Sequence, residues 1–225
     1  MMMKNILYII PICIFLLSAC EYDNYDEPNA TLKGSVVYNG KSVGIRTDGP
    51  QLELWQDGFA LKKSIPVYIA QDGTFSVSLF NGQYKLVRKA DGPWLPQLND
   101  TIIVDVKGNT VFDVPVTPYF VAKDESYQKV GETISVKFTV DKVVSTADLS
   151  SVNIYFGKGI LTDHNRNEGI VNVPIGNVTV GQEITVSAAI PAGLKNENFV
   201  FMRIGVLANV SSEYYYTQSQ KINLK

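Results

Sequence analysis

The fold class of this 225-residue chain is decided by the stretch DGTFSVSLFNG, residues 72–82. Its apolar residues Phe75, Val77 and Leu79 alternate with threonine and serine, which is the period-two pattern of a strand with one buried face. Asp-Gly precedes this pattern and Asn-Gly follows it, and both pairs are two-residue turn signals of the hairpin type. We therefore expect a strand here that turns back antiparallel into a second strand over residues 83–88.

The same alternation continues over the first half of the chain. It predicts further strands at residues 31–38, 51–55, 101–106 and 110–116, the last two joined by a turn at Lys107-Gly108-Asn109. No long segment shows the i, i+3, i+4, i+7 apolar spacing of an amphipathic helix, and strand-favouring residues are abundant. The sequence therefore predicts an all-β protein.

Short motifs in this half carry a resemblance to a known fold. Gly34, Asp72-Gly73-Thr74-Phe75, Gly82-x-Tyr84 and Gly108-Asn109-Thr110 are spaced as in the carboxypeptidase regulatory, or prealbumin-like, β-sandwich. The resemblance covers residues 31–117 and implies an accessory or adhesive module without catalytic residues. Because these motifs mainly encode turns, they bear on the fold and not on the function.

Two prolines mark the expected domain boundary. Pro115 and Pro118 remove backbone donors and favour an extended connection, so we place one sandwich at residues 31–118 and a second at residues 119–225. The strands of the second sandwich are predicted at residues 133–140, 151–156, 183–190, 199–208 and 214–224. Strands at this spacing are typical of an immunoglobulin-like sandwich.

The strand predicted at residues 199–208 differs from the others because it is almost continuously apolar, as expected for a central strand covered on both faces. The stretch from Phe199 to Asn209 also resembles the penultimate strand of fibronectin type III domains, with phenylalanine in place of the usual tyrosine. The expected fold is thus all-β, with a prealbumin-like and then an immunoglobulin- or fibronectin III-like β-sandwich in tandem after a cleaved lipoprotein signal peptide.

The first twenty residues have the pattern of an export and anchoring signal. Lys4 is followed by an apolar run of about twelve residues, too short for the roughly twenty of a membrane span. The closing residues Leu17-Ser18-Ala19-Cys20 resemble the lipobox of bacterial lipoproteins, which implies that residues 1–19 are removed and that Cys20 is acylated. The alternatives are an ordinary secretory peptide cut after Ala19 and an uncleaved membrane helix, which Pro11 disfavours.

Residues 20–30 are expected to comprise the lipidated cysteine and an acidic tether without apolar periodicity. Acidic residues just after the cysteine resemble the signal that displays Bacteroidetes lipoproteins on the outer face of the outer membrane, so we expect a surface lipoprotein facing the cell exterior. A plain polar spacer is the alternative. Since Cys13 lies in the removed segment, the mature chain would keep one cysteine and could form no internal disulfide.

Composition and motifs argue against several classes of function. Without residues 1–20 the chain carries 19 Lys and Arg against 22 Asp and Glu and has no basic cluster, so no nucleic-acid partner is expected. His164 is the only histidine, and no hydrolase or zinc-protease motif occurs. Residues 163–169 begin like a calcium loop, but Glu168 and Pro174 stand where that pattern needs glycine and glutamate, which favours a plain polar loop. We expect no enzyme activity, no cofactor and no metal site.

Glycan binding would require exposed aromatic rings, because sugar rings stack their C–H faces on them. Trp94 follows Asp91-Gly92-Pro93 in a proline-braced loop and is our first choice for such a platform, with a packing plug as the alternative. Trp55 at a strand end and Tyr215 in the run 214–216 are further candidates. For Trp55 we favour a core position, and for the tyrosine run an edge-strand cover.

Taken together, these features resemble a Bacteroidetes family of two-domain lipoproteins of unassigned function, across nearly the whole chain. The resemblance implies an association with polysaccharide-utilisation systems, in which the partners would be a TonB-dependent outer-membrane transporter and its lipoprotein partner. Two hypotheses follow: a non-catalytic accessory or structural protein of such a system, and a protein that binds polysaccharide directly through exposed aromatic residues.

Overall fold

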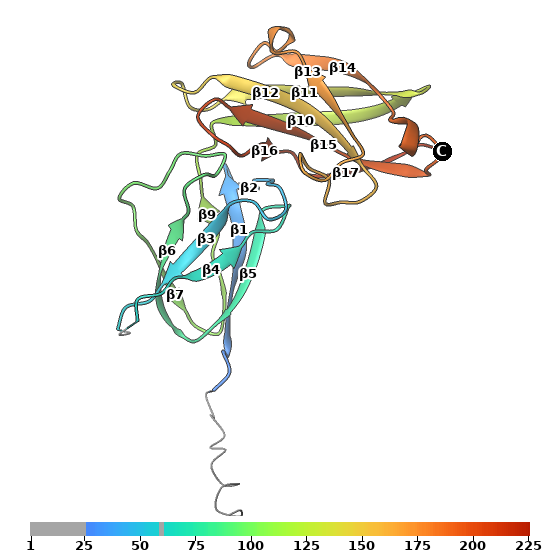
Figure 1. Cartoon of the computed structure of the whole chain (residues 1–225). Helices are drawn as coiled ribbons and strands as arrows, with labels where there is room; N and C mark the ends of the chain where they lie inside the picture. The colour runs from blue at the N-terminus through green and yellow to red at the C-terminus, as the bar shows by residue number, and fades with distance from the viewer. Residues whose placement is uncertain (1–25, 59–60) are drawn as a thin grey trace, which may run out of the picture.

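The structure, a computed structural model, describes residues 26–58 and 61–225, and it folds as two β-sandwiches in tandem (Figure 1). The predicted signal peptide, Cys20 and most of the tether lie outside the described residues. The strands of the N-terminal sandwich are β1 (Ala30–Tyr38), β2 (Lys41–Ser42), β3 (Gln51–Trp55), β4 (Ile65–Tyr68), β5 (Thr74–Leu79), β6 (Gly82–Arg88), β7 (Ile102–Val106), β8 (Asn109–Val111) and β9 (Val114–Pro115).

These strands divide between two sheets. One sheet has the order β2-β1-β5, with β8 and β9 pairing in parallel along the other side of β1, and the second has the order β4-β3-β6-β7. The strand expected at residues 110–116 is interrupted between β8 and β9. At the interruption the Asp113 carboxylate accepts a hydrogen bond from the Ser35 amide at 2.9 Å, so a side chain replaces one ladder contact.

The hairpin expected at Asn81-Gly82 is wrong, and the turn expected at Lys107-Gly108-Asn109 does not join two neighbouring strands of one sheet either. In both places the chain crosses from one sheet to the other. At the first, β5 pairs with β1 whereas β6 pairs with β3 and β7. At the second, β7 pairs with β6 whereas β8 pairs with β1. The alternation correctly predicts which residues face inward, and Phe75 and Tyr84 meet in one core. The Tyr84 hydroxyl donates to the Phe80 carbonyl at 2.9 Å and closes this corner. Periodicity fixes the buried face of a strand but not its neighbour.

The C-terminal sandwich also has two sheets, in the orders β10-β11-β14 and β13-β12-β15-β16, with β17 pairing to the other end of β15. This arrangement fits the expected immunoglobulin-like architecture. The elements are β10 (Phe120–Val130), β11 (Thr133–Lys142), β12 (Leu149–Gly157), β13 (Gly169–Val173), β14 (Glu183–Ala189), β15 (Phe199–Ala208), β16 (Tyr215–Tyr216) and β17 (Gln220–Asn223), with 3-10 turns at Ile175–Asn177 and Ala192–Leu194.

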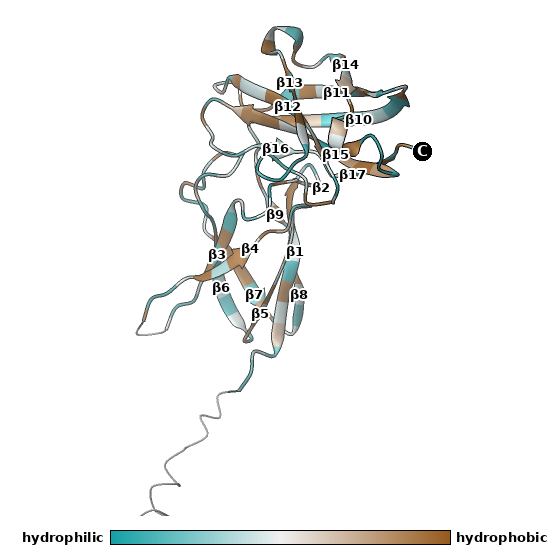
Figure 2. Cartoon of the chain, turned by 45° about the vertical axis from the view of Figure 1, so that its right-hand side comes forward, coloured by the Kyte–Doolittle hydropathy of each residue, from teal (hydrophilic) through white to brown (hydrophobic). Residues whose placement is uncertain are grey.

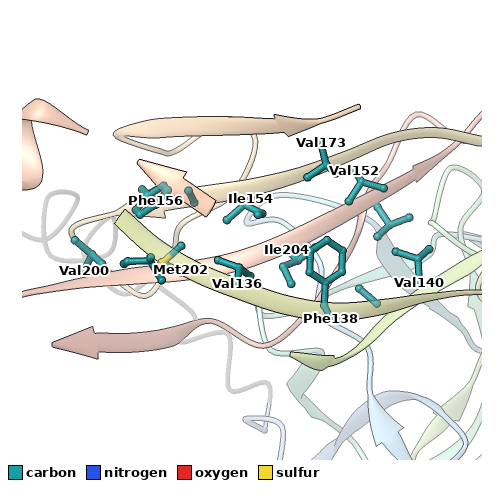
Figure 3. Close-up of a cluster of buried hydrophobic side chains, with 14 of the residues drawn as sticks. Val136, Phe138, Val140, Val152, Ile154, Phe156, Val173, Val200, Met202 and Ile204 are labelled. Carbon is teal, nitrogen blue, oxygen red and sulfur yellow. The ribbon is translucent and has the colours of Figure 1, made fainter. Parts of the chain in front are cut away.

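The core of this sandwich lies between its two sheets. Apolar side chains from β11, β12 and β15 fill it, among them Phe138, Phe156 and Met202 (Figure 3). Hydropathy colouring shows the same alternation of apolar and polar residues along the strands (Figure 2). Strand β10 was not predicted, since only its first residues are apolar and buried and the remainder is charged and polar. None of the helical turns in residues 26–58 and 61–225 is long and apolar enough to cross a membrane.

Gly34 explains one of the motifs behind the prealbumin-like resemblance. A Cβ at this position would lie 1.9 Å from the Phe112 carbonyl oxygen, because the chain between β8 and β9 runs directly beside β1 there. A side chain would therefore force backbone apart from backbone, and no rotamer change could relieve the clash.

We predict that Gly34→Ala lowers the free energy of unfolding by about 1–3 kcal/mol, the usual cost of overpacking. The matched control is Gly193→Ala, at an exposed position where a Cβ would meet nothing within 4 Å; it should change the free energy by less than about 0.5 kcal/mol. Urea denaturation of both variants measures the difference. Equal effects would contradict the close approach at Gly34.

Candidate functional site

Arg203 lies at the centre of the contact between the two sandwiches. It interrupts the apolar strand β15, where Met202 and Ile204 point into the C-terminal core and Arg203 points the opposite way, toward the N-terminal sandwich. Its side chain is fully buried. The prediction that this strand is covered on both faces is confirmed around Arg203, where the cover on the outer face includes the neighbouring domain.

The guanidinium group binds backbone carbonyls from both domains. Nε donates to Thr217 at 3.1 Å, and Nη1 donates to Thr162 at 3.4 Å, both in the C-terminal sandwich. Nη1 also donates to Ile45 at 3.1 Å, and Nη2 donates to Gln71 at 3.3 Å, both in the N-terminal sandwich. A guanidinium offers five N–H groups in a fixed fork, so these carbonyls occupy most of its donor capacity.

No carboxylate pairs directly with Arg203 within the described residues. Instead the guanidinium carbon lies 4.4 Å from the centre of the Tyr216 ring, a cation–π contact. Burial lowers the pKa of Arg203 to about 10, while the nearby Tyr216 and Asp163 oppose that shift. The group therefore stays charged at neutral pH, and its charge is balanced by carbonyl dipoles and an aromatic face.

A glycine makes room for this arrangement. The Gly44 carbonyl accepts a hydrogen bond from the Tyr216 amide at 3.0 Å, which forms a single antiparallel bridge between the domains. A Cβ on Gly44 would lie 2.5 Å from the Tyr216 carbonyl oxygen and 2.6 Å from Nη2 of Arg203. Only glycine lets the two backbones approach this closely.

Ion pairs flank the buried arginine. Arg46 binds Glu213 through Nε and Nη2 at 2.6–3.0 Å, a two-pronged pair across the domains. The guanidinium and Glu213 lie close enough that their hydrogen bonds raise the pKa of Arg46. Farther out, Arg166 pairs with Asp48 at 2.9 Å in an exposed position.

The loop that begins like a calcium site has a structural role at this junction. The Asp163 side chain is buried; its Oδ1 accepts hydrogen bonds from the Asn165 and Arg166 amides, and its Oδ2 accepts one from the Thr47 amide in the N-terminal domain. Both carboxylate oxygens thus bind backbone amides. The described residues contain no group of three His, Cys, Asp or Glu side chains placed to hold a metal ion.

His164 stands next to this loop. Its ring stacks on Tyr214 with the ring centres 5.2 Å apart, and its Nδ1 lies 3.4 Å from the Tyr155 hydroxyl. The amide of Asn153 donates to the hydroxyls of both tyrosines, at 3.1 and 3.2 Å. This cluster covers the outer face of β12, and the rings of Tyr155 and Tyr214 pack against the ring of Tyr216.

A cleft of about 710 Å³ opens beside the junction, between the end of β1 and the start of β10. Its walls combine aromatic, apolar, hydroxyl, amide and charged side chains. They come from both domains and comprise Tyr38, Asn39, Lys41, Ser42, Asp72, Thr74, Val121, Ala122, Lys123, Asp124, Glu125, Asp141, Val143, Tyr215, Tyr216, Thr217 and Gln218.

The three residues predicted to contact a glycan lie in three different environments. Trp94 is only 2% exposed and bridges to Pro118 at the domain connection, so the favoured platform at Trp94 is wrong and the packing-plug alternative describes it. Trp55 belongs to neither core and lies half-buried on the outer face of β3, with its Nε1 donating to Glu53 at 3.3 Å. Tyr215 lines the cleft and packs against both cores.

Sequence reasoning missed Arg203 and the cleft. The available signal was an arginine in the middle of a strand predicted to be covered on both faces, since a buried charge always needs partners. Nothing local in the sequence indicates that those partners are carbonyls of another domain.

We predict that Arg203→Met lowers the free energy of unfolding by about 3 kcal/mol or more, because it leaves buried carbonyls without donors. Arg166→Met is the matched control: it removes the exposed pair with Asp48 from the same interface, which should cost about 1 kcal/mol or less. Urea unfolding followed by tryptophan fluorescence, which reports on the N-terminal domain, and by circular dichroism measures both variants. Equal losses would contradict the central role of Arg203.

Comparison with known proteins identifies the family. Residues 30–117 match the N-terminal domain of DUF3823, a protein of unknown function, and residues 120–221 match the domain of unknown function DUF3823_C. A DUF3823 family protein from Bacteroides ovatus is 49% identical with a TM-score of 0.83, and one from Parabacteroides merdae is 30% identical with a TM-score of 0.80. Each match covers 88% of this chain and 100% of the other.

A third solved structure, a candidate carbohydrate-binding protein from Bacteroides uniformis, is 20% identical with a TM-score of 0.71 and the same coverage, a likeness that shows the fold alone. None of the curated proteins matches the chain. The two family matches and the relative at 49% identity confirm the resemblance to a two-domain Bacteroidetes family of unknown function: the chain belongs to the DUF3823 family.

Proposed function

We propose that this protein is a non-catalytic lipoprotein that is anchored through Cys20, displayed on the outer face of the outer membrane, and acts as an accessory component of a polysaccharide-capture system. Its partners would be the membrane and, in that system, a TonB-dependent transporter with its lipoprotein partner. The sequence features of residues 1–30 motivate the anchor and the display, and the path of β1 supports an anchor at the end of the molecule opposite to the cleft.

The observation that carries the proposal is the direction of β1. Its last residue, Tyr38, lines the cleft at the domain junction, and its first residue, Ala30, lies at the opposite end of the N-terminal sandwich (Figures 1 and 2). A nine-residue strand spans about 26 Å at 3.3 Å per step. An anchor ten residues before Ala30 would therefore join the molecule at the end of the N-terminal sandwich that lies away from the cleft and the C-terminal sandwich.

The state of the buried charges supports a role without catalysis. Most of the hydrogen-bonding capacity of Arg203 and Asp163 is taken up by backbone carbonyls and amides. Catalytic groups, in contrast, need free capacity toward a substrate. These side chains hold two domains together, which suits a rigid arm on a cell surface.

We predict that Cys20→Ala moves the protein out of the membrane fraction, because it removes the acylated residue. Cys13→Ala is the matched control and should leave the protein in the membrane, since that cysteine lies in the removed segment. In intact cells producing the unaltered protein, a membrane-impermeant amine reagent should label it.

Membrane fractionation and labelling measure these outcomes separately. A Cys20→Ala protein that has lost residues 1–19 and still stays in the membrane would contradict the anchor. Unlabelled protein in intact cells, with labelling restored after lysis, would contradict display on the outer face.

A further inference from the structure

We propose that the cleft between the two sandwiches binds an uncharged oligosaccharide. This inference rests on the proposed function and names the ligand class and the site within it. The cleft volume of about 710 Å³ lies inside the range of about 300–1,000 Å³ that is usual for small-molecule sites. Of the three aromatic residues considered from the sequence, the cleft contains Tyr215 but neither Trp94 nor Trp55.

The cleft combines aromatic and apolar surface with hydroxyl groups. Tyr38 and Tyr215 contribute aromatic surface from opposite domains, and Val121, Ala122 and Val143 add an apolar wall. A sugar ring needs such surface for its C–H faces. Burial raises the pKa of Tyr215 to about 12, so its hydroxyl stays protonated and can both donate and accept at neutral pH.

Strand β10 has an irregularity where it lines the cleft. The ladder between β10 and β11 shifts register between Lys123 and Ser126, and Asp124 adopts a left-handed φ of 56°. Such bulges re-aim side chains and concentrate near functional sites, and a left-handed aspartate costs backbone strain. Here the two residues at the shift, Asp124 and Glu125, both line the cleft.

The charged side chains that line the cleft are mainly acidic. The cleft lining holds Asp72, Asp124, Glu125 and Asp141 against Lys41 and Lys123, which disfavours a phosphate or another anion. Lys123 already pairs with Asp141. The described residues offer no cluster of three metal-ligating side chains, which disfavours a divalent cation. The Asp124 carboxylate, which can accept from a hydroxyl group, and the Asn39 amide and Tyr38 and Tyr215 hydroxyls, which can donate, fit a neutral polyol.

The two walls of the cleft are held in place by a contact between the domains. The Gln218 side chain lines the cleft and donates to the carbonyls of Ser42 at 3.4 Å and Asp72 at 3.1 Å in the other domain. Together with Arg203 this contact fixes the two walls relative to each other. A site whose walls are already ordered loses less entropy when it binds.

The test is isothermal titration calorimetry of the purified full chain with malto-, cello-, xylo- and manno-oligosaccharides, with inorganic phosphate and calcium chloride as alternative probes. At least one neutral oligosaccharide should bind. Asp124→Asn keeps a residue that tolerates left-handed φ but removes the carboxylate, and Tyr215→Phe removes only a hydroxyl. Each should weaken binding about tenfold, the effect of one hydrogen bond to a charged or well-placed group.

Matched controls make the same chemical changes outside the cleft. Asp105→Asn on β7 and the exposed Tyr68→Phe on β4 should leave the affinity unchanged. The proposal is overturned if no oligosaccharide binds, if phosphate or calcium binds in their place, or if Trp55→Ala abolishes binding while both cleft variants retain it. These results concern the ligand alone, whereas failure of the anchor or of surface display would appear only in fractionation and labelling.

Discussion

One buried guanidinium determines how the two halves of this protein are joined. Arg203 is buried away from water. Its guanidinium instead donates to carbonyls of both sandwiches and contacts the face of the Tyr216 ring. Two of these carbonyls belong to the N-terminal sandwich, so the buried guanidinium keeps its full set of partners only while the two domains are in contact. Gly44 and the two-pronged Arg46–Glu213 pair complete the same surface.

This junction makes a linear tandem of domains into a single body with a defined cleft. The cleft exists only because Tyr38 and Asp72 of one sandwich face Tyr215 and Asp124 of the other. Inter-domain contacts within a chain are usually modest and allow relative motion. Here several backbone groups and a buried cation cross the boundary, which favours a fixed geometry suited to holding a ligand or a partner at a constant distance from a membrane anchor.

The sequence predicts those features of the structure that depend on neighbouring residues and misses those that depend on residues far apart along the chain. The period-two pattern of Phe75, Val77 and Leu79 predicts a strand and its buried face, because both depend on neighbouring residues alone. The sheet partner of that strand depends on residues far along the chain, so the hairpin at Asn81-Gly82 was wrong. Trp94 shows the same limit: its loop chemistry suits an exposed platform as well as a packing plug, and only packing into the N-terminal core makes it a plug.

The central claim is that Arg203 holds the two sandwiches as one rigid body. Its most direct test is a double electron–electron resonance measurement between spin labels at the exposed positions Ser78 and Lys137, one in each sandwich. The account predicts a single narrow distance distribution for the unaltered protein and a broad one for Arg203→Met. A distribution that is broad in both proteins, or equally narrow in both, would contradict it.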